Sequence, residues 1–215
     1  MNEPTDEKAN QPVHPSSLIP HPFVSPFVRV FCAVELTPEV RARVAEHIAR
    51  LRDAWPKVRA SWERAGKLHI TLKFLGEIEQ PRVEALSSAA TRAVEGTARF
   101  DLSIEGAGAF PPRGNPRVLW LGVIDPSGGL ALLVRRLEDE CAREGFPRAE
   151  RPFHPHLTIA RLRMPEGARR LAETHKETGF EAASLTVAAI TVVRSEVGPG
   201  GSRYSTISNH QLNPA

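Results

Sequence analysis

The sequence predicts an α+β fold of two lobes, each a mainly antiparallel sheet flanked by helices, with a cleft between them. Strand-like segments outnumber helical ones, so the helices are too few for an alternating parallel fold. Two short segments, His69–Leu72 and His156–Ile159, are near copies of each other. Each copy also follows a strongly amphipathic helix and precedes a weaker one. This repeated order indicates an internal duplication with two similar lobes facing each other.

Composition allows one sizeable domain or two small lobes. The chain has 215 residues, of which 41% are hydrophobic and 25% charged, and its formal net charge is +3. Only five of the 28 basic residues are Lys, and the planar fork of Arg suits phosphate. This weakly favours a phosphate-bearing or nucleic-acid partner, although a general bias toward Arg gives the same composition. No apolar run approaches the length of a membrane span.

The ends of the chain differ from its middle. Residues 1–24 are rich in Pro and lack apolar periodicity, so we expect a disordered tail before a domain at 25–212. The N-terminus lacks the basic start and apolar stretch of a signal peptide. Cys32 and Cys141 lie far apart in apolar segments, which is typical of reduced core residues. We therefore expect a cytoplasmic protein.

The first half is predicted to hold two strands and two helices. Thr37 is a good helix cap, Pro38 suits the first helical position, and Gly96 suits a helix C-terminus. The predicted elements are a strand at Phe27–Leu36, a helix from Pro38 to Pro56, a strand at Leu68–Leu75 and a helix from Pro81 to Gly96.

The second half repeats this order with additional strands. Ser127 can cap its first helix, which stops at Gly145. The predicted elements are a strand at Phe100–Glu105, a loop at Gly106–Pro112, a strand at Arg117–Ile124, a helix from Ser127 to Gly145, a strand at His156–Leu162, a helix at Pro165–Thr178, and strands at Leu185–Val193 and Tyr204–Ser208.

The two copies have the form His-x-Thr-x with aliphatic residues at both x positions. Because residues i and i+2 of a strand face the same way, His69 lies beside Thr71, and His156 beside Thr158. If the strands meet near a pseudo-twofold axis, two imidazoles face each other with two hydroxyls. One neutral and one protonated histidine supply the base and the acid of an in-line displacement at phosphorus. The hydroxyls can hold non-bridging phosphate oxygens.

Other readings of the histidines stay open at this point. A histidine on a strand is often a structural residue, although two equivalent copies favour chemistry. A metal site is an alternative, because His154 and His156 share a face, but zinc would need further ligands and none has suitable spacing. His154 is expected to position the start of its strand. His47, His175 and His210 are expected at or near the surface.

The segments HITLKFLGEI (His69 to Ile78) and HPHLTIAR (His154 to Arg161) resemble the two-histidine (2H) phosphoesterase superfamily. More closely, they resemble the bacterial and archaeal RNA 2′,3′-cyclic phosphodiesterases, also called 2′-5′ RNA ligases. RVFCAVEL, GAFPP and RVLWLGV support the likeness, which covers about residues 27–208. It implies a bilobal fold, no metal or other cofactor, and hydrolysis of an RNA terminal 2′,3′-cyclic phosphate to a 2′-phosphomonoester. The reverse reaction would be an ATP-independent 2′-5′ ligation.

The resemblance also implies the role of each residue. His69 would be the general acid and His156 the general base, while Thr71 and Thr158 hold phosphate oxygens. Arg161 matches a phosphate-contacting Arg of the family, although strict alternation puts it on the face opposite His156, so the strand must bend or end there.

Further expectations concern the rim of the cleft and the substrate. Lys73 shares the predicted face of His69 and Thr71, as added positive charge or as a solvated residue. Trp62, Phe110 and Phe153 could stack on an unpaired RNA end, or be core residues. The expected partner is a single-stranded RNA end, bound by a monomer. A small cyclic phosphodiester as substrate, or an RNA-end binder without catalysis, remains the alternative.

Overall fold

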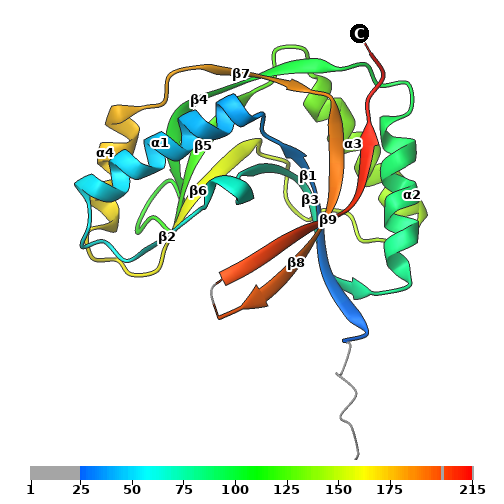
Figure 1. Ribbon diagram of the computed structural model, residues 1–215, viewed down its shortest axis with the longest axis horizontal. Coiled ribbons are helices and arrows are strands. Elements are labelled where there is room, and N and C mark those ends of the chain that lie inside the picture. The colour runs from blue at the N-terminus through cyan, green and yellow to red at the C-terminus, as the bar shows by residue number, and fades with distance from the viewer. Residues whose placement is uncertain (1–24, 200, 215) are drawn as a thin grey trace, which may run out of the picture.

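The computed structural model describes residues 25–199 and 201–214 (Figure 1). The predicted tail at 1–24 lies outside the described residues. The strands are β1 (Phe27–Glu35), β2 (Ala60–Trp62), β3 (His69–Glu79), β4 (Phe100–Phe110), β5 (Val118–Ile124), β6 (His156–Leu162), β7 (Ala183–Val187), β8 (Ala189–Gly198) and β9 (Gly201–Gln211). The helices are α1 (Pro38–Ala54), α2 (Arg82–Val94), α3 (Gly129–Arg143) and α4 (Ala168–Thr178), with a 3₁₀ turn at Ala65–Lys67.

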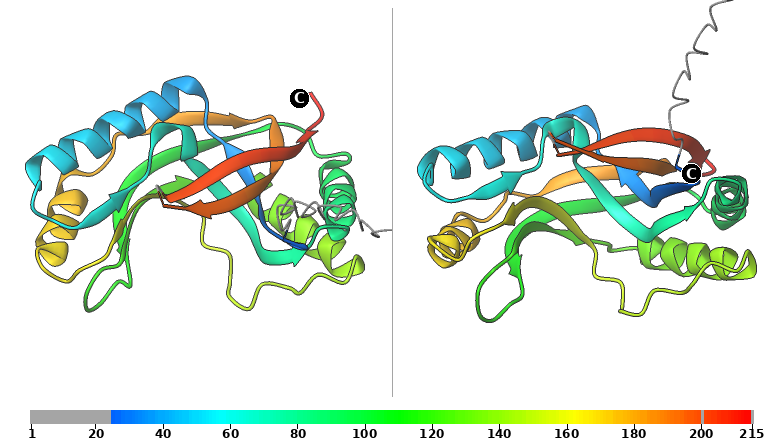
Figure 2. Two further views of the ribbon diagram at one scale, coloured as in Figure 1. Left: turned by 60° about the horizontal axis from the view of Figure 1, so that its bottom comes forward. Right: turned by 90° about the horizontal axis from the view of Figure 1, so that it is seen from below.

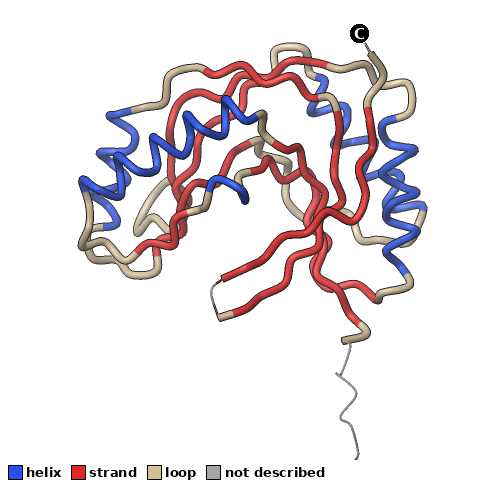
Figure 3. Tube along the Cα trace, viewed as in Figure 1, coloured by secondary structure: helices blue, strands red, loops and turns tan. Residues whose placement is uncertain are grey.

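All nine strands belong to one curled antiparallel sheet (Figures 1 and 3). Its order is β7-β4-β5-β6-β3-β1-β8-β9, and β2 pairs with β6 beside this path. β3 and β6 are joined through a single residue pair, Ile70 with Leu157. The two antiparallel sheets predicted from the sequence are therefore halves of one sheet that nearly separate at this pair. The α+β class is confirmed.

The helices gather at the two ends of the curled sheet (Figure 2). α1 and α4 pack on the half formed by β4 to β7, whereas α2 and α3 pack on the half formed by β1, β3, β8 and β9. The helix that precedes each motif strand thus packs on the half containing the other motif strand. Each lobe consequently draws on both halves of the chain, and one hydrophobic cluster runs through both. This reciprocal exchange is what a duplicated pair of interlocked lobes produces.

Local signals placed most elements correctly. Thr37 accepts a hydrogen bond from the Val40 amide, with Pro38 in the first turn of α1. Ser127 was predicted to cap α3, but the N-cap residue is Gly128, and the Ser127 hydroxyl accepts from the Gly129 amide just after it. The loop predicted at Gly106–Pro112 is wrong, because β4 continues to Phe110 and pairs with β5 there. The positive φ of 70° at Gly106 accommodates a bulge, which a run of small residues disguises as a loop.

Three histidines expected at the surface are buried, so those predictions are wrong. Nε2 of His47 lies 3.1 Å from Nδ1 of His175, and Nε2 of His175 lies 3.0 Å from the carbonyl oxygen of Trp120. Because that oxygen only accepts, His175 donates to it and accepts from His47. This chain ties α1 and α4 to β5. His210 bonds Thr91 and Ser208 under α2.

The remaining sequence expectations concern the core and the membrane. Cys32 and Cys141 are free and buried, as predicted. None of the helices in the described part of the chain is long and apolar enough to cross a membrane.

Candidate active site

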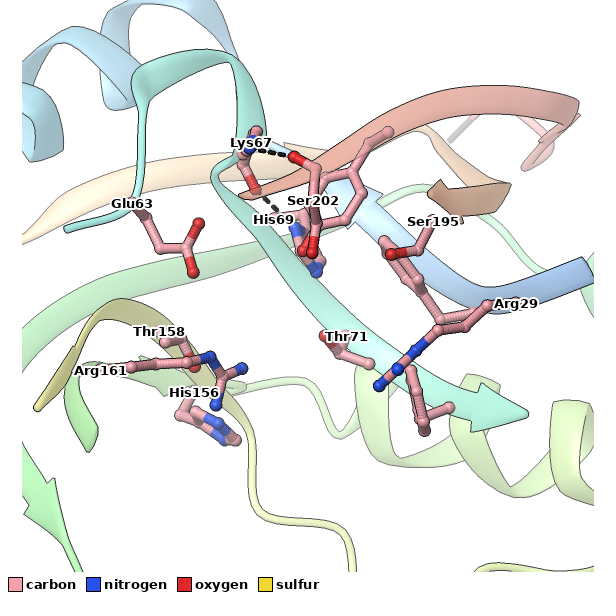
Figure 4. Close-up of a pocket in the computed structure, with 13 residues that line it drawn as sticks. Arg29, Glu63, Lys67, His69, Thr71, His156, Thr158, Arg161, Ser195 and Ser202 are labelled. Carbon is pink, nitrogen blue, oxygen red and sulfur yellow. Dashed lines mark hydrogen bonds between the residues drawn. The ribbon is translucent and has the colours of Figure 1, made fainter. Parts of the chain in front are cut away.

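A cavity of about 380 Å³ lies where β3 and β6 meet (Figure 4). Residues from both halves of the sheet line it. They are Arg29 and Phe31 from β1, Glu63 and Lys67 before β3, His69, Thr71 and Phe74 from β3, His156, Thr158 and Arg161 from β6, and Ser195, Ser202 and Tyr204 from β8 and β9. All five residues predicted for the site are therefore in one cavity, which we call the central cavity.

The two His-x-Thr segments are arranged reciprocally around the Ile70–Leu157 pair. Because this pairing is antiparallel, His69 lies on the side of Thr158, and Thr71 lies on the side of His156. Figure 4 shows the side chains from β6 facing those from β3 across the cavity. The pseudo-twofold axis expected from the duplication thus passes through the cavity.

Each cavity histidine is oriented by the same backbone contact. Nδ1 of His69 lies 2.6 Å from the carbonyl oxygen of Lys67, and Nδ1 of His156 lies 2.7 Å from that of His154. A carbonyl oxygen accepts only, so both Nδ1 atoms carry the proton and donate it. Nε2 is left free in each ring to give or take a proton. His154 therefore positions the ring of His156 through its backbone.

The surroundings of the two imidazoles differ. His69 stacks on Phe31 at 4.7 Å between ring centroids, with the edge of Tyr204 at 5.5 Å. Burial lowers the pKa of His69 below its ordinary value of 6.5, and the charge of Arg161 acts in the same direction. The hydrogen bond to Lys67 and the charge of Glu35 oppose this shift. Among the described residues, His156 forms one aromatic pair, with Phe110. The two rings are nearly perpendicular, and their centroids lie 5.3 Å apart.

Both motif strands are bulged one residue after the threonine. Against β1, the partner of Ala33 is Thr71 and the partner of Cys32 is Lys73, so Leu72 is the extra residue. Against β5, Thr158 pairs with Trp120 and Ala160 with Leu119, which leaves Ile159 extra. An extra residue inverts the alternation of faces beyond it. Arg161 therefore reaches the face of His156, as the bend anticipated from the sequence requires.

The bulge at Leu72 likewise turns Lys73 away from the cavity and places Phe74 in its lining. Lys73 is 4% exposed, and its ammonium donates to Glu138 at 2.7 Å and to the carbonyl oxygen of Pro147 at 2.8 Å. Both readings offered for Lys73, added charge at the rim and a solvated residue, are wrong for this reason. Phe74 and Arg161 each stand five residues after their histidine, so they occupy equivalent places in the two halves.

Several residues of the cavity were missed by sequence reasoning. Arg29 and Tyr204 come from β1 and β9, which only long-range strand pairing brings beside β3. Lys67 donates to the carbonyl oxygen of Ser202, and its ammonium lies 5.7 Å from the centre of the Tyr204 ring. Burial raises the pKa of Glu63, while the charges of Arg161 and Lys67 oppose the shift. One sequence signal could have found some of these residues. The alternation of β1 puts Arg29 and Phe31 on one face of that strand, and both line the cavity.

The three aromatic residues suggested for base stacking lie outside the central cavity. Trp62 on β2 packs partly against the core. Phe110 and Phe153 line a neighbouring groove, which the central cavity joins. Among residues 25–199 and 201–214, no group of three or more His, Cys, Asp or Glu side chains is placed to hold a metal ion.

A curled antiparallel sheet with two His-x-Thr segments facing each other at its centre defines a two-histidine phosphoesterase. Residues 38–199 match the model of the 2′-5′ RNA ligase superfamily, and the chain belongs to this family. It is 34% identical over 188 residues to the RNA 2′,3′-cyclic phosphodiesterase of Methanothermobacter thermautotrophicus, covering 86% of this chain and 99% of that protein. The protein of the same name from Escherichia coli is 32% identical over 184 residues, covering 86% and 96%.

Solved structures show the same fold. TT0787 of Thermus thermophilus superposes with a TM-score of 0.71 at 27% identity, over 86% of this chain and 97% of that one. Escherichia coli LigT complexed with 3′-AMP gives a TM-score of 0.68 at 30% identity, over 87% and 99%.

Proposed function

We propose that the protein hydrolyses the 2′,3′-cyclic phosphate at the end of a single-stranded RNA to a 2′-phosphomonoester. The observation that carries this proposal is the pair of imidazoles with matching Nδ1–H donation, which leaves two Nε2 atoms in one cavity. The relatives named RNA 2′,3′-cyclic phosphodiesterase supply the substrate class.

Each histidine moves one proton in this reaction. His156, neutral at Nε2, takes a proton from water as the water oxygen attacks phosphorus. The bond from phosphorus to the ribose 3′-oxygen breaks opposite the incoming oxygen, and protonated His69 gives its Nε2 proton to that 3′-oxygen. The ribose 2′-oxygen keeps the phosphate. Each transfer contributes roughly 10²–10⁴ in rate.

Three side chains hold the phosphate in line. The hydroxyls of Thr71 and Thr158 donate to non-bridging oxygens from opposite sides, since they share the cavity with both imidazoles. Arg161 adds a planar charged donor that can bind two oxygens at once. The charge of Arg161 also compensates the negative charge that develops on these oxygens.

No metal or other cofactor enters this mechanism, since both proton transfers are assigned to imidazoles. The reverse direction follows when a 5′-hydroxyl of a second RNA replaces water and forms a 2′-5′ linkage. The strained ring supplies the energy, and the roles of acid and base exchange. The proposed enzyme acts as a monomer in the cytoplasm.

The test is incubation with a short RNA ending in a 2′,3′-cyclic phosphate, in EDTA, with 2′- and 3′-phosphate products resolved. We expect the 2′-phosphate alone, and loss of product with His69→Ala and with His156→Ala. Thermal unfolding of each variant controls for misfolding. Dependence on a metal would overturn the two-histidine mechanism. Turnover of a nucleoside cyclic phosphate but not of the RNA would change the substrate class.

A further inference from the structure

A second depression, which we call the side groove, opens from the central cavity on the side of His156. Its volume is about 970 Å³, and it shares Thr71, Phe74 and His156 with the central cavity. The two depressions therefore adjoin at these three residues, next to one of the two histidines. The proposed hydrolysis gives the groove no role.

The groove is built on anchored segments. One wall is the stretch between α3 and β6, which Glu138 secures by accepting from Lys73 and from the Ala149 amide at 3.2 Å. Lys73 also donates to the carbonyl oxygen of Pro147 in the same stretch. The other wall is the end of β4 and the start of β5, at Phe110 and Val118. The buried ion pair of Lys73 thus positions one wall.

The lining combines aromatic rings with guanidinium groups. Phe74 is 55% exposed, and Phe110 and Phe153 also line the groove. Arg117 and Arg151 are exposed there and form no ion pair within the described part of the chain, whereas Arg148 pairs with Asp139 at 2.8 Å. Aromatic faces beside a positively charged track are what single-stranded nucleic acid requires, because bases stack and phosphates meet cations. A small ligand would need neither the length nor the separate charges.

The pseudo-twofold relation singles out Phe74. Its equivalent in the other half is Arg161, which faces the phosphate site. Where one half has a cation, the other presents a ring at the junction of cavity and groove, with the guanidinium of Arg29 lying 5.0 Å from the ring centre. A ring in this place can receive the base next to the reacting phosphate.

We propose that the side groove binds the nucleotides immediately 5′ of the terminal cyclic phosphate. Their bases stack on Phe74 and Phe153, and their phosphates face Arg117 and Arg151. This inference rests on the proposed function and extends it, because it makes an oligonucleotide a better substrate than a nucleoside cyclic phosphate.

The depression at the other side of the cavity, beside the β8–β9 hairpin, fits this role less well. Tyr204 is its one aromatic residue among those described, and that ring already packs against Phe31 at 5.2 Å. Glu196 adds a negative charge there. Arg64 and Arg203 also line that depression, so the side groove is distinguished by its several aromatic rings and not by its cations.

The first test measures binding, which does not require turnover. A 5′-fluorescein pentanucleotide RNA ending in a 2′-phosphate is titrated by anisotropy at several salt concentrations. Removing two phosphate contacts in Arg117→Gln/Arg151→Gln should lower the slope of log K against log salt by about 1.4. Arg170→Gln, an exposed arginine on α4, is the matched control. An unchanged slope in the double variant would overturn the proposal.

The second test compares two substrates of the same reaction. The ratio of kcat/KM for a cyclic-phosphate trinucleotide over that for a nucleoside cyclic phosphate should fall roughly 5- to 100-fold with Phe153→Leu, which removes one stacking face. Phe27→Leu, at an exposed phenylalanine that lines neither the central cavity nor the side groove, should leave the ratio unchanged. A wild-type ratio near one would refute the groove while leaving the hydrolysis intact. RNA binding that depends on the two arginines, without any hydrolysis, would support the groove and refute the proposed hydrolysis.

Discussion

The β3 and β6 halves of the site share a backbone plan and differ in their side chains. Each supplies a histidine that donates to the carbonyl two residues earlier, a threonine two residues later, and a bulge directly after the threonine. Beyond the bulge the halves diverge, with Phe74 on one side and Arg161 on the other. The two halves thus share a backbone plan and differ in the side chains that they bring into the cavity beyond the bulge.

The surroundings of the histidines diverge in the same way. His69 is stacked on Phe31 and edged by Tyr204, and burial lowers its pKa. His156 lies at the opening of the side groove. The packing around His69, and not its motif, therefore lowers the pKa of that ring. Breaking the two halves separately is the way to test this difference.

The largest effect is expected from the histidines themselves. His69→Ala and His156→Ala each remove one proton transfer and should lower kcat by roughly 10²–10⁴. The double variant should lose much less than the product of the two, because the transfers belong to one displacement. Single-turnover kinetics with the cyclic-phosphate RNA measures this. A residual rate above a tenth of wild type in either variant would contradict the paired roles.

A smaller effect is expected where the halves differ. Arg161→Gln removes a charged hydrogen bond worth about 1.5–3 kcal/mol and should lower kcat/KM by roughly 10- to 100-fold. Arg163→Gln is the matched control, since Arg163 is exposed two residues further on and donates to Ser61 outside the cavity. Equal losses in the two variants would mean that general positive charge, and not a phosphate contact, explains the effect.

The pH profile distinguishes acid from base. As the acid, His69 must be protonated, so kcat/KM should fall as pH rises through its lowered pKa, which puts the alkaline limb below 6.5. Tyr204→Ala exposes His69 to water, raises its pKa, and should move this limb to higher pH. A bound phosphate also favours the protonated ring, so the limb of kcat should lie above that of kcat/KM. If Tyr204→Ala instead moves the limb of the kcat/KM profile at low pH, His69 is the base.

The site could be predicted from the sequence as far as local geometry carries. The alternation of a strand places Thr71 beside His69 and Thr158 beside His156 without knowledge of the fold. Caps such as Thr37 and Gly145 fix helix ends through nearby contacts. The resemblance of the motif segments indicated the family, which the comparison with the superfamily model shows.

The sequence predictions that failed concern residues whose positions depend on contacts between distant segments. A bulge at Leu72 is visible only in the pairing with β1, and without it Lys73 is assigned to the wrong face. Tyr204 reaches His69 because β8 and β9 extend the sheet beside β1. His47 was expected near the surface because its partner, His175, is 128 residues away.

The buried His47–His175 pair should have the smallest effect on turnover and a clear effect on stability. Burial lowers the pKa of His47 to about 4, below its ordinary value of 6.5. Above pH 6.5 the ring is neutral in both states, so ionisation contributes nothing. Between pH 6.5 and 4 the unfolded chain binds a proton that the folded chain does not, and the free energy of unfolding falls as pH falls.

The expected loss from His47 across this range is on the order of 3 kcal/mol, since one pKa unit corresponds to about 1.4 kcal/mol. Urea unfolding between pH 4 and 7 measures it. His47→Gln keeps a donor for His175 but cannot ionise, so its stability should depend less steeply on pH while its activity at pH 7 matches wild type. A parallel pH dependence in this variant would show that acid destabilisation comes from other groups.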